Sequence, residues 1–281
     1  NTLSAGEITA LDGGTGQPYS THPAGGLLAA HDDTPSIETG EGGFAALGAL
    51  KGIAPTSSGQ SFGYIGTNAT SSVTVRATTY TPQTNEAQRS ISSSSASDTS
   101  AGTGARQVKI TYYDATLAGP STETVTLNGT TAVNTVQTNI AFIEKLEVVS
   151  AGSGGGNVGA ITLYIGTGGG GGGFASFAAG DNMTYWAHHH VPTNVTCYIT
   201  QIFGSAAIIA GGITINTANP ISGNTIPQIS PDITMRYSSS EVLRHYATPL
   251  AIVGPVIIWL NTRPDSSTAS TTFAGFHWAQ I

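Results

Sequence analysis

The sequence predicts a mainly β protein, with a β-sandwich or jelly-roll body that follows an extended, irregular N-terminal arm. Apolar and polar residues alternate in short segments such as 108–113, which is the period of a half-buried strand. Turns rich in Gly, Pro and Ser separate these segments at the spacing typical of sandwiches. No convincing amphipathic helix lies between them, so we expect little helix.

The arm is predicted over residues 1–60 and the body over residues 61–281. The first 60 residues are rich in Gly, Ala and Pro, alternate poorly and hold one helix-like patch at 44–50. Arms of this kind become ordered against a neighbour, where binding offsets their conformational entropy. We interpret the segment as an attachment arm; the alternative is a loosely structured segment without that role.

The best-specified part of the body is residues 98–149, which predict a meander of strands. Strands are expected at 108–113 and 122–127, separated by a loop that contains Gly119-Pro120. Asn128-Gly129 then predicts a tight hairpin turn, because both residues tolerate positive φ. The apolar run at 140–149 closes the meander.

The other strands are expected in short apolar segments along the body. Their predicted ranges are 62–65, 72–79, 160–165, 183–189, 195–203, 213–218, 233–237, 244–246, 256–262 and 272–278. The Ser-rich stretch 90–104 predicts a flexible loop. The nearly pure glycine run 167–173 predicts an exposed loop or a place of close backbone packing.

The composition predicts self-association and argues against two classes of partner. Charged residues make up 9 % of the chain, against about 25 % in ordinary soluble domains. So few charges predict that much of the surface meets other subunits. A net charge of −7 with only 9 Lys and Arg residues argues against nucleic-acid binding, which needs a basic patch. No apolar run approaches the roughly 18 residues of a membrane span, so we expect no membrane contact.

One cysteine, Cys197, excludes an intrachain disulfide, and its apolar neighbours predict a small buried core residue. The most visible polar cluster is His188-His189-His190. On a strand, His188 and His190 point the same way and could bind one metal ion. No Asp, Glu or Cys stands nearby at a matching spacing. We therefore predict no metal site, keep these two histidines as the metal candidates, and expect a polar strand end or a subunit contact.

Two motifs resemble known functional loops but lack the required context. Residues 59–63 match the nucleophile pattern G-x-S-x-G, which needs a helix after the serine, and none is predicted here. Residues 154–159 match G-x-G-x-x-G, but a strand follows rather than a helix N-terminus, so no phosphate site is expected. We predict no catalytic residue and no cofactor.

Glycan cleavage remains an alternative because carboxylates scattered in the sequence could pair in space. The candidates are Asp114, Glu123, Asp181, Asp232 and Glu241. Several aromatic residues could stack on sugars, although their alternation with apolar residues favours core packing: Tyr185, Trp186, Tyr237, Tyr246 and Trp259.

Three segments carry a resemblance to virion structural proteins of tailed bacteriophages. They are the GTGAR turn with the later ETVTLNGTT strand, the run 186–192 followed by 196–200, and the close with Thr248-Pro249-Leu250, Gly254-Pro255 and 271–276. The resemblance covers roughly residues 99–276. It implies a particle protein and brings no catalytic motif with it.

The expected function is therefore a non-enzymatic structural protein of a tailed phage particle. We expect it to decorate or cement the capsid through its arm and through self-association, with the major capsid protein or another virion protein as partner. A homotrimer is expected by analogy with other β-rich virion appendages. On the capsid surface it would be a decoration protein or a head fibre. The alternatives are a tail fibre or receptor-binding protein that binds a host surface glycan, and a carbohydrate-active enzyme.

Overall fold

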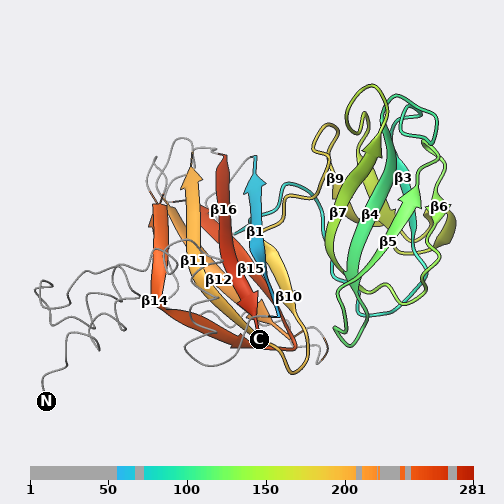
Figure 1. The fold of residues 1–281 in the computed structure, drawn as a ribbon. Coiled ribbons are helices and arrows are strands. Elements are labelled where there is room, and N and C mark those ends of the chain that lie inside the picture. Colours follow the sequence, from blue (N-terminus) through green and yellow to red (C-terminus); the bar gives the residue numbers. More distant parts are fainter. Residues whose placement is uncertain are drawn as a thin grey trace, which may run out of the picture. The chain divides into compact units, whose positions relative to one another are not determined.

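Antiparallel strands make up most of the described part of the chain, which contains no α-helix (Figure 1). The structure is a computed structural model that describes residues 56–66, 73–206, 211–219, 221, 235–237, 242–264 and 271–281. The predicted mainly β fold is confirmed. No helix in these ranges has the length and apolar character needed to cross a membrane.

The predicted arm lies outside the described residues except for residues 56–60. Strand β1 (Ser57–Ile65) starts before the predicted beginning of the body at residue 61. Residues 57–281 form one unit and residues 1–56 another. The description below concerns the first of these.

Two facing sheets form what we call the terminal sandwich, because it contains the first and last described strands. One sheet contains, in spatial order, β1, β16 (Thr272–Gln280), β11 (Thr196–Ala206) and β14 (Val242–Val253). The other contains β10 (His188–Val191), β15 (Val256–Pro264), β12 (Gly211–Ala218) and β13 (Met235–Tyr237), with β2 (Val73–Thr74) also paired to β15.

The core of the terminal sandwich follows the two-residue period of its strands. In β12, Ile213 and Ile215 are buried, and Ile258 and Leu260 of β15 join the same cluster. Cys197 of β11 is buried there too, as the sequence predicted. Alternation in the sequence therefore located the inward face of these strands.

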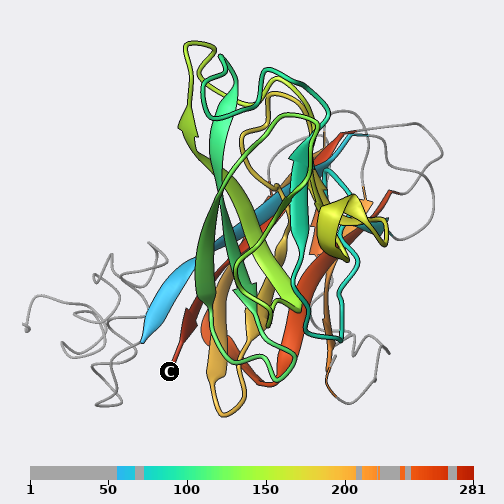
Figure 2. The ribbon, with the colours of Figure 1, turned by 90° about the vertical axis from the view of Figure 1, so that its right-hand side faces the viewer.

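Between β2 and β10 the chain builds a second pair of sheets, the inserted sandwich, drawn mostly in green in Figure 2. One sheet contains β6 (Val133–Asn134), β3 (Ser90–Ser93), β8 (Ile161–Tyr164) and β9 (Gly173–Phe177). The other contains β5 (Ser121–Thr126), β4 (Ala105–Tyr113) and β7 (Phe142–Ala151). A single 3-10 turn, η3 (Thr167–Gly169), lies between β8 and β9.

The inserted sandwich has its own core, and a smaller cluster connects it to the terminal sandwich. Ile110, Leu146 and Leu163 are among the fully buried residues between its two sheets. In the connecting cluster, Phe142 of β7 packs with Ile257 of β15. The unit thus has two main cores joined by apolar contacts.

The predicted meander is correct in its strands and wrong in one turn. Asn128-Gly129 does form a turn, in which Gly129 has φ +61° and the Thr131 N–H donates to the Asn128 carbonyl (3.1 Å). The next strand, β6, pairs with β3 in the opposite sheet rather than with β5. The hairpin partner of β5 is β4, reached through Gly119-Pro120. The turn is tied instead to the β3 end, because Ser93 N–H donates to the Gly129 carbonyl (2.9 Å).

The predicted serine loop 90–104 is partly wrong, because its first four residues form the buried strand β3. Serine can be buried when its hydroxyl is hydrogen-bonded. The Ser90 hydroxyl donates to the Gly166 carbonyl (2.6 Å), and the Ser92 hydroxyl lies 3.2 Å from that of Tyr164. Strand β9 was also missed, since its first residue is the last glycine of the predicted loop 167–173.

Arg89, just before β3, is a buried cation that has no carboxylate partner among the described residues. Its guanidinium donates to the carbonyls of Ile140 (2.9 Å), Ile165 (2.6 Å) and Asn85 (2.5 Å). Burial lowers the pKa of this group from its ordinary value. These bonds hold three chain segments around β3. No pattern in the sequence predicted this role of Arg89.

Asp98 organises the loops at the end of β3. Its carboxylate accepts hydrogen bonds from the Ser93 hydroxyl (2.5 Å) and from three backbone N–H groups, those of Ala105 (2.7 Å), Gly159 (2.8 Å) and Val158 (2.9 Å). Burial alone would raise the pKa of Asp98, but these donors hold it below its ordinary value. The glycine motif 154–159 therefore directs N–H groups at a protein carboxylate.

Replacing Asp98 with Asn should lower the free energy of unfolding by about 3 kcal/mol at neutral pH, because buried N–H donors would then face an amide. The folded-state pKa of Asp98 is depressed, so the stabilisation is full above the unfolded pKa of about 3.9 and is lost as pH falls through the folded pKa. The difference between wild type and variant should therefore shrink on acidification. Urea unfolding at neutral pH and at about pH 3 measures it.

Asp114→Asn is the matched control, because Asp114 accepts the Thr116 and Ala118 N–H groups in an exposed turn. It should cost at most about 1 kcal/mol. Equal losses for the two variants would contradict the role assigned to Asp98.

Candidate functional site

The three consecutive histidines form β10 and are buried, with 4, 2 and 0 % of His188, His189 and His190 exposed. The sequence predicted a polar strand end or a subunit contact, whereas these histidines lie in the interior of the unit. Strand β10 is covered on one side by β15, to which it pairs from His188↔Trp259 to Val191↔Val256. Burial of three imidazoles requires partners for their ring nitrogens. Both ring nitrogens of His189 and of His190 have a partner, and His188 has one at Nε2.

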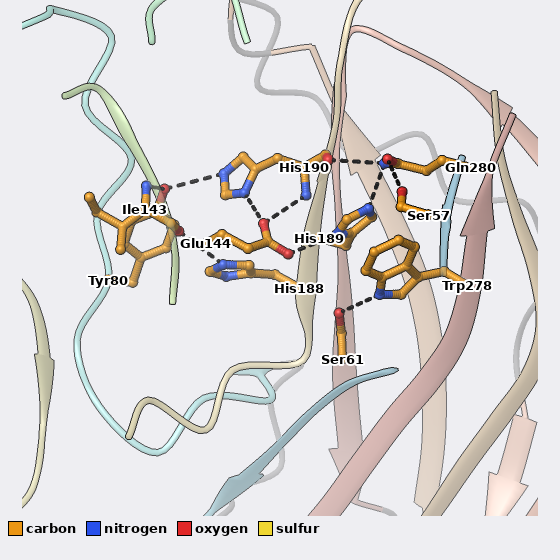
Figure 3. Close-up of polar contacts among 10 residues, drawn as sticks. All are labelled: Ser57, Ser61, Tyr80, Ile143, Glu144, His188, His189, His190, Trp278 and Gln280. Carbon is orange, nitrogen blue, oxygen red and sulfur yellow. Dashed lines mark hydrogen bonds and ion pairs between the residues drawn. The ribbon is translucent and has the colours of Figure 1, made fainter. Parts of the chain in front are cut away.

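A carboxylate from the inserted sandwich meets these histidines. Glu144 lies on β7 and reaches β10 with both oxygens (Figure 3). Its Oε1 lies 2.7 Å from His189 Nδ1, and its Oε2 lies 2.6 Å from His190 Nδ1. Oε2 also accepts the backbone N–H of His190 at 3.1 Å. One carboxylate thus satisfies two imidazoles and a backbone amide.

On one side of this carboxylate, Tyr80 and the β7 backbone complete the network. The Tyr80 hydroxyl accepts the Ile143 N–H (3.1 Å) and lies 3.3 Å from His190 Nε2. His188 Nε2 lies 3.1 Å from the Ile143 carbonyl, which can only accept, so this nitrogen carries the hydrogen. We assign the Tyr80 hydrogen to His190 Nε2, which leaves the hydrogen on His190 Nδ1 for Glu144.

On the other side, His189 contacts the last strand of the terminal sandwich (Figure 3). Gln280 Nε2 donates to His189 Nε2 at 2.7 Å, while the Ser57 hydroxyl donates to Gln280 Oε1 at 3.1 Å. The Trp278 ring stacks on the His189 imidazole at 3.7 Å between centroids. Because His189 Nε2 accepts from Gln280, its Nδ1 carries the hydrogen that Glu144 receives.

The electrostatics of the cluster follow from burial and these contacts. Burial alone would raise the pKa of the Glu144 carboxyl, but His189 and His190 hold it well below its ordinary value. Burial, followed by the proximity of His190, lowers the pKa of His188 to about 3, so this imidazole is neutral. Burial raises the pKa of the Tyr80 hydroxyl, which keeps its hydrogen. The site therefore holds a carboxylate close to one neutral imidazole, His188, and one neutral hydroxyl, Tyr80.

The cluster also has the composition of a metal site. One donor atom from each of Glu144, His188 and His190 lies within 4.8 Å of the other two. Both histidine candidates named from the sequence are thus in it. Glu144 was missed because it stands 45 residues before His189 and is brought there by strand packing alone. No local spacing could have indicated it.

The carboxylates considered for glycan cleavage have local structural partners where they are described. Glu123 accepts the Val136 and Gln137 N–H groups, and Asp114 accepts those of its own turn. Asp181 accepts the Tyr64 hydroxyl at 3.5 Å. Asp232 and Glu241 lie outside the described residues.

The other motif residues and aromatic candidates have structural surroundings. Ser61 sits within β1, where its hydroxyl accepts the Trp278 indole N–H (3.1 Å), and no helix follows it. Trp186 is buried and stacks on Tyr80 at 4.8 Å. The side chains of Tyr246 and Trp259 pack against core clusters. Tyr185 is half-buried, with its ring beside that of Phe62.

No family model and no curated protein matches the chain.

The network predicts the effect of removing the Tyr80 hydroxyl. In Tyr80→Phe, the buried Ile143 N–H and His190 Nε2 lose their partner, so the free energy of unfolding should fall by about 1–3 kcal/mol. Tyr164→Phe is the control, since its hydroxyl contacts only the Ser92 hydroxyl among the described bonds and is partly exposed. It should cost less than about 1 kcal/mol. Urea unfolding of both variants is the measurement, and a larger loss for Tyr164→Phe would refute the network.

Proposed function

We propose that the chain is a non-enzymatic structural protein of a tailed phage particle, which decorates or cements the capsid as a homotrimer attached through residues 1–60. The sequence resemblance over residues 99–276 supports the class of protein. One structural observation supports self-association, namely an aromatic surface on the sheet that contains β1 and β16.

We call this surface the aromatic face and define it by Phe62, Tyr64, Phe203, Leu243 and Phe273. Pairing places Tyr64 opposite Phe273, and Phe203 opposite Leu243. The ring centroids of Tyr64 and Phe273 lie 5.7 Å apart. Phe62, Leu243 and Phe273 are exposed by 42, 49 and 49 %. These large side chains stand on neighbouring strands and share one side of the sheet.

Two features mark the aromatic face as a contact surface. A side chain at Gly275 would collide with both Phe62 and Phe203, so glycine allows these two rings to lie across β16. The positions on the same side of β1 and β16, namely 60, 62, 64, 273, 275 and 277, hold no Asp, Glu, Lys or Arg. Extended exposed apolar surfaces of this kind characterise interaction sites.

Apolar burial at about 25 cal/mol per Å² is the larger available contribution to such an interface. Exposed ion pairs contribute only about 0–1 kcal/mol each, and the face has no charged side chain at those positions. A subunit contact there would be held by apolar burial.

We expect an oligomer that persists from low salt to about 1 M salt, which screens charges within a few ångströms. Phe62→Gln combined with Phe273→Gln should shift it towards monomer, because each change places an amide in the contact. Light scattering measures both effects. Val136→Gln is the control, since Val136 is 79 % exposed on the inserted sandwich. A wild-type monomer in both buffers, or dissociation by salt alone, would contradict the proposal.

Attachment is tested separately with a chain that starts at Ser57, the first residue of β1. This chain should fold, because both sandwiches are retained, and should fail to bind phage particles that lack the protein. Co-sedimentation with such particles is the measurement. Binding equal to that of the full chain would place the anchor in the sandwiches.

The second candidate is a tail fibre or receptor-binding protein. Tyr185 and Phe62 lie side by side, with ring centroids 5.5 Å apart, near the Asp181 carboxylate that accepts the Tyr64 hydroxyl. Aromatic rings beside a carboxylate suit a sugar ligand. Hundreds of copies in each particle would favour the cement protein, whereas a dozen or fewer, with loss of host-cell binding in Tyr185→Ala, would favour this candidate.

A further inference from the structure

We propose that Glu144, His188 and His190 bind one divalent transition-metal ion, with Zn²⁺ as the preferred ion, and that the ion joins β7 to β10. This inference concerns the interior of the unit and does not depend on the proposed role in a phage particle.

The donor set selects the class of ion. Two imidazoles and one carboxylate are ligands that Zn²⁺ and neighbouring transition metals favour, whereas Mg²⁺ and Ca²⁺ require mostly oxygen ligands. His188 and His190 alternate along one strand, and Glu144 approaches from another. Three donors from two strands leave a fourth position for water, as in open zinc sites.

The separation of the donor atoms fits an ion after small movements. Ligands of a tetrahedral zinc site lie about 3.4 Å apart, given metal–ligand bonds of about 2.0–2.2 Å. The donor atoms here lie within 4.8 Å of one another. His190 Nδ1 and Glu144 Oε2, now 2.6 Å apart, would separate slightly as the ion replaces the hydrogen between them. Each donor atom would have to move by less than about 1 Å, through rotation of its side chain, to reach these ligand distances.

The surroundings of the donors distinguish this cluster from a chance meeting of polar residues. Metal-binding histidines usually donate their second N–H to a carbonyl, and metal-binding carboxylates are themselves hydrogen-bonded. His188 already has a ring N–H bonded to the Ile143 carbonyl (3.1 Å), and Glu144 Oε1 is already held by His189 (2.7 Å). When the ion takes His190 Nδ1, the hydrogen moves to Nε2, where the Tyr80 oxygen can accept it.

Access and charge also suit an ion. The Glu144 side chain is 17 % exposed, so solvent reaches the cluster although both histidines are buried. His188 donates from Nε2 to the Ile143 carbonyl, which leaves Nδ1 as its ring nitrogen for an ion. Glu144 supplies the anionic oxygen ligand that complements two imidazoles on a divalent transition metal.

Metal binding is tested on the full chain after removal of bound metal with a chelator. Titration with Zn²⁺, followed by calorimetry and by elemental analysis of the dialysed protein, should give one ion per chain. His188→Gln and His190→Gln should each weaken binding by about 100-fold or more, since outer partners alone change affinity by about 10–100-fold. His277→Gln is the matched control, a partly buried histidine outside the cluster, and should bind as wild type does.

A second readout does not require the ligand variants to fold. The Trp186 ring lies 5.2 Å from the His188 ring, and the Trp278 ring stacks on His189, so Co²⁺ bound at the cluster should quench tryptophan fluorescence, and Trp186→Phe should reduce the quenched part. Co²⁺ should also show the visible absorption bands of a tetrahedral site. Failure of the wild type to bind Zn²⁺, or the absence of any tryptophan quenching by Co²⁺ in the wild type, would overturn the proposal. Binding unchanged in both ligand variants would equally overturn it.

Discussion

The carboxylate of Glu144, which is 17 % exposed, is the polar constraint that joins the two sandwiches alongside the apolar cluster of Phe142 and Ile257. Removing a carboxylate from water costs several kcal/mol unless its oxygens accept hydrogen bonds. All three donors to Glu144 come from His189 and His190. β7 and β10 therefore cannot separate without exposing a charge and three N–H groups at once. The hydrogen bonds from Tyr80 and Gln280 extend this requirement to the segment before β3 and to β16.

Charged residues are scarce in this chain, and two others, Asp98 and Arg89, are also placed inside the fold and hydrogen-bonded there. Asp98 is fully buried and accepts hydrogen bonds from four donors, and Arg89 is 1 % exposed and donates to three carbonyls. These ionic groups stabilise loops and strand ends from inside. The aromatic face, in contrast, lacks charge on β1 and β16. Such a distribution favours a protein whose interior is fixed by polar bonds and whose outer contacts are apolar.

Sequence reasoning located most strands, because half-buried strands record their orientation in the alternation of side chains. It identified Cys197 as buried and His188 and His190 as facing the same way. It missed β3, because serines predict a loop unless their buried partners are known, and the partners of Ser90 and Ser92 lie more than 70 residues away. It missed Glu144 for the same reason. Local patterns specify which face of a strand is buried; they do not specify which distant strand supplies the missing partner.

Strand β16 shows why the local alternation of side chains and the pairing with distant strands must agree. Its inward positions include Ala274 and Phe276 in the core and Gln280 at His189, whereas Phe273 points outward into the aromatic face. A shift of one residue in pairing would exchange the two sides, because side chains alternate with a period of two. It would remove Gln280 from His189 and bury Phe273. The Gln280 side chain donates to His189 and accepts from Ser57, and these two bonds fix the register of β16 against β1. The aromatic face requires the same register, so β16 determines both the interior network and the outer face.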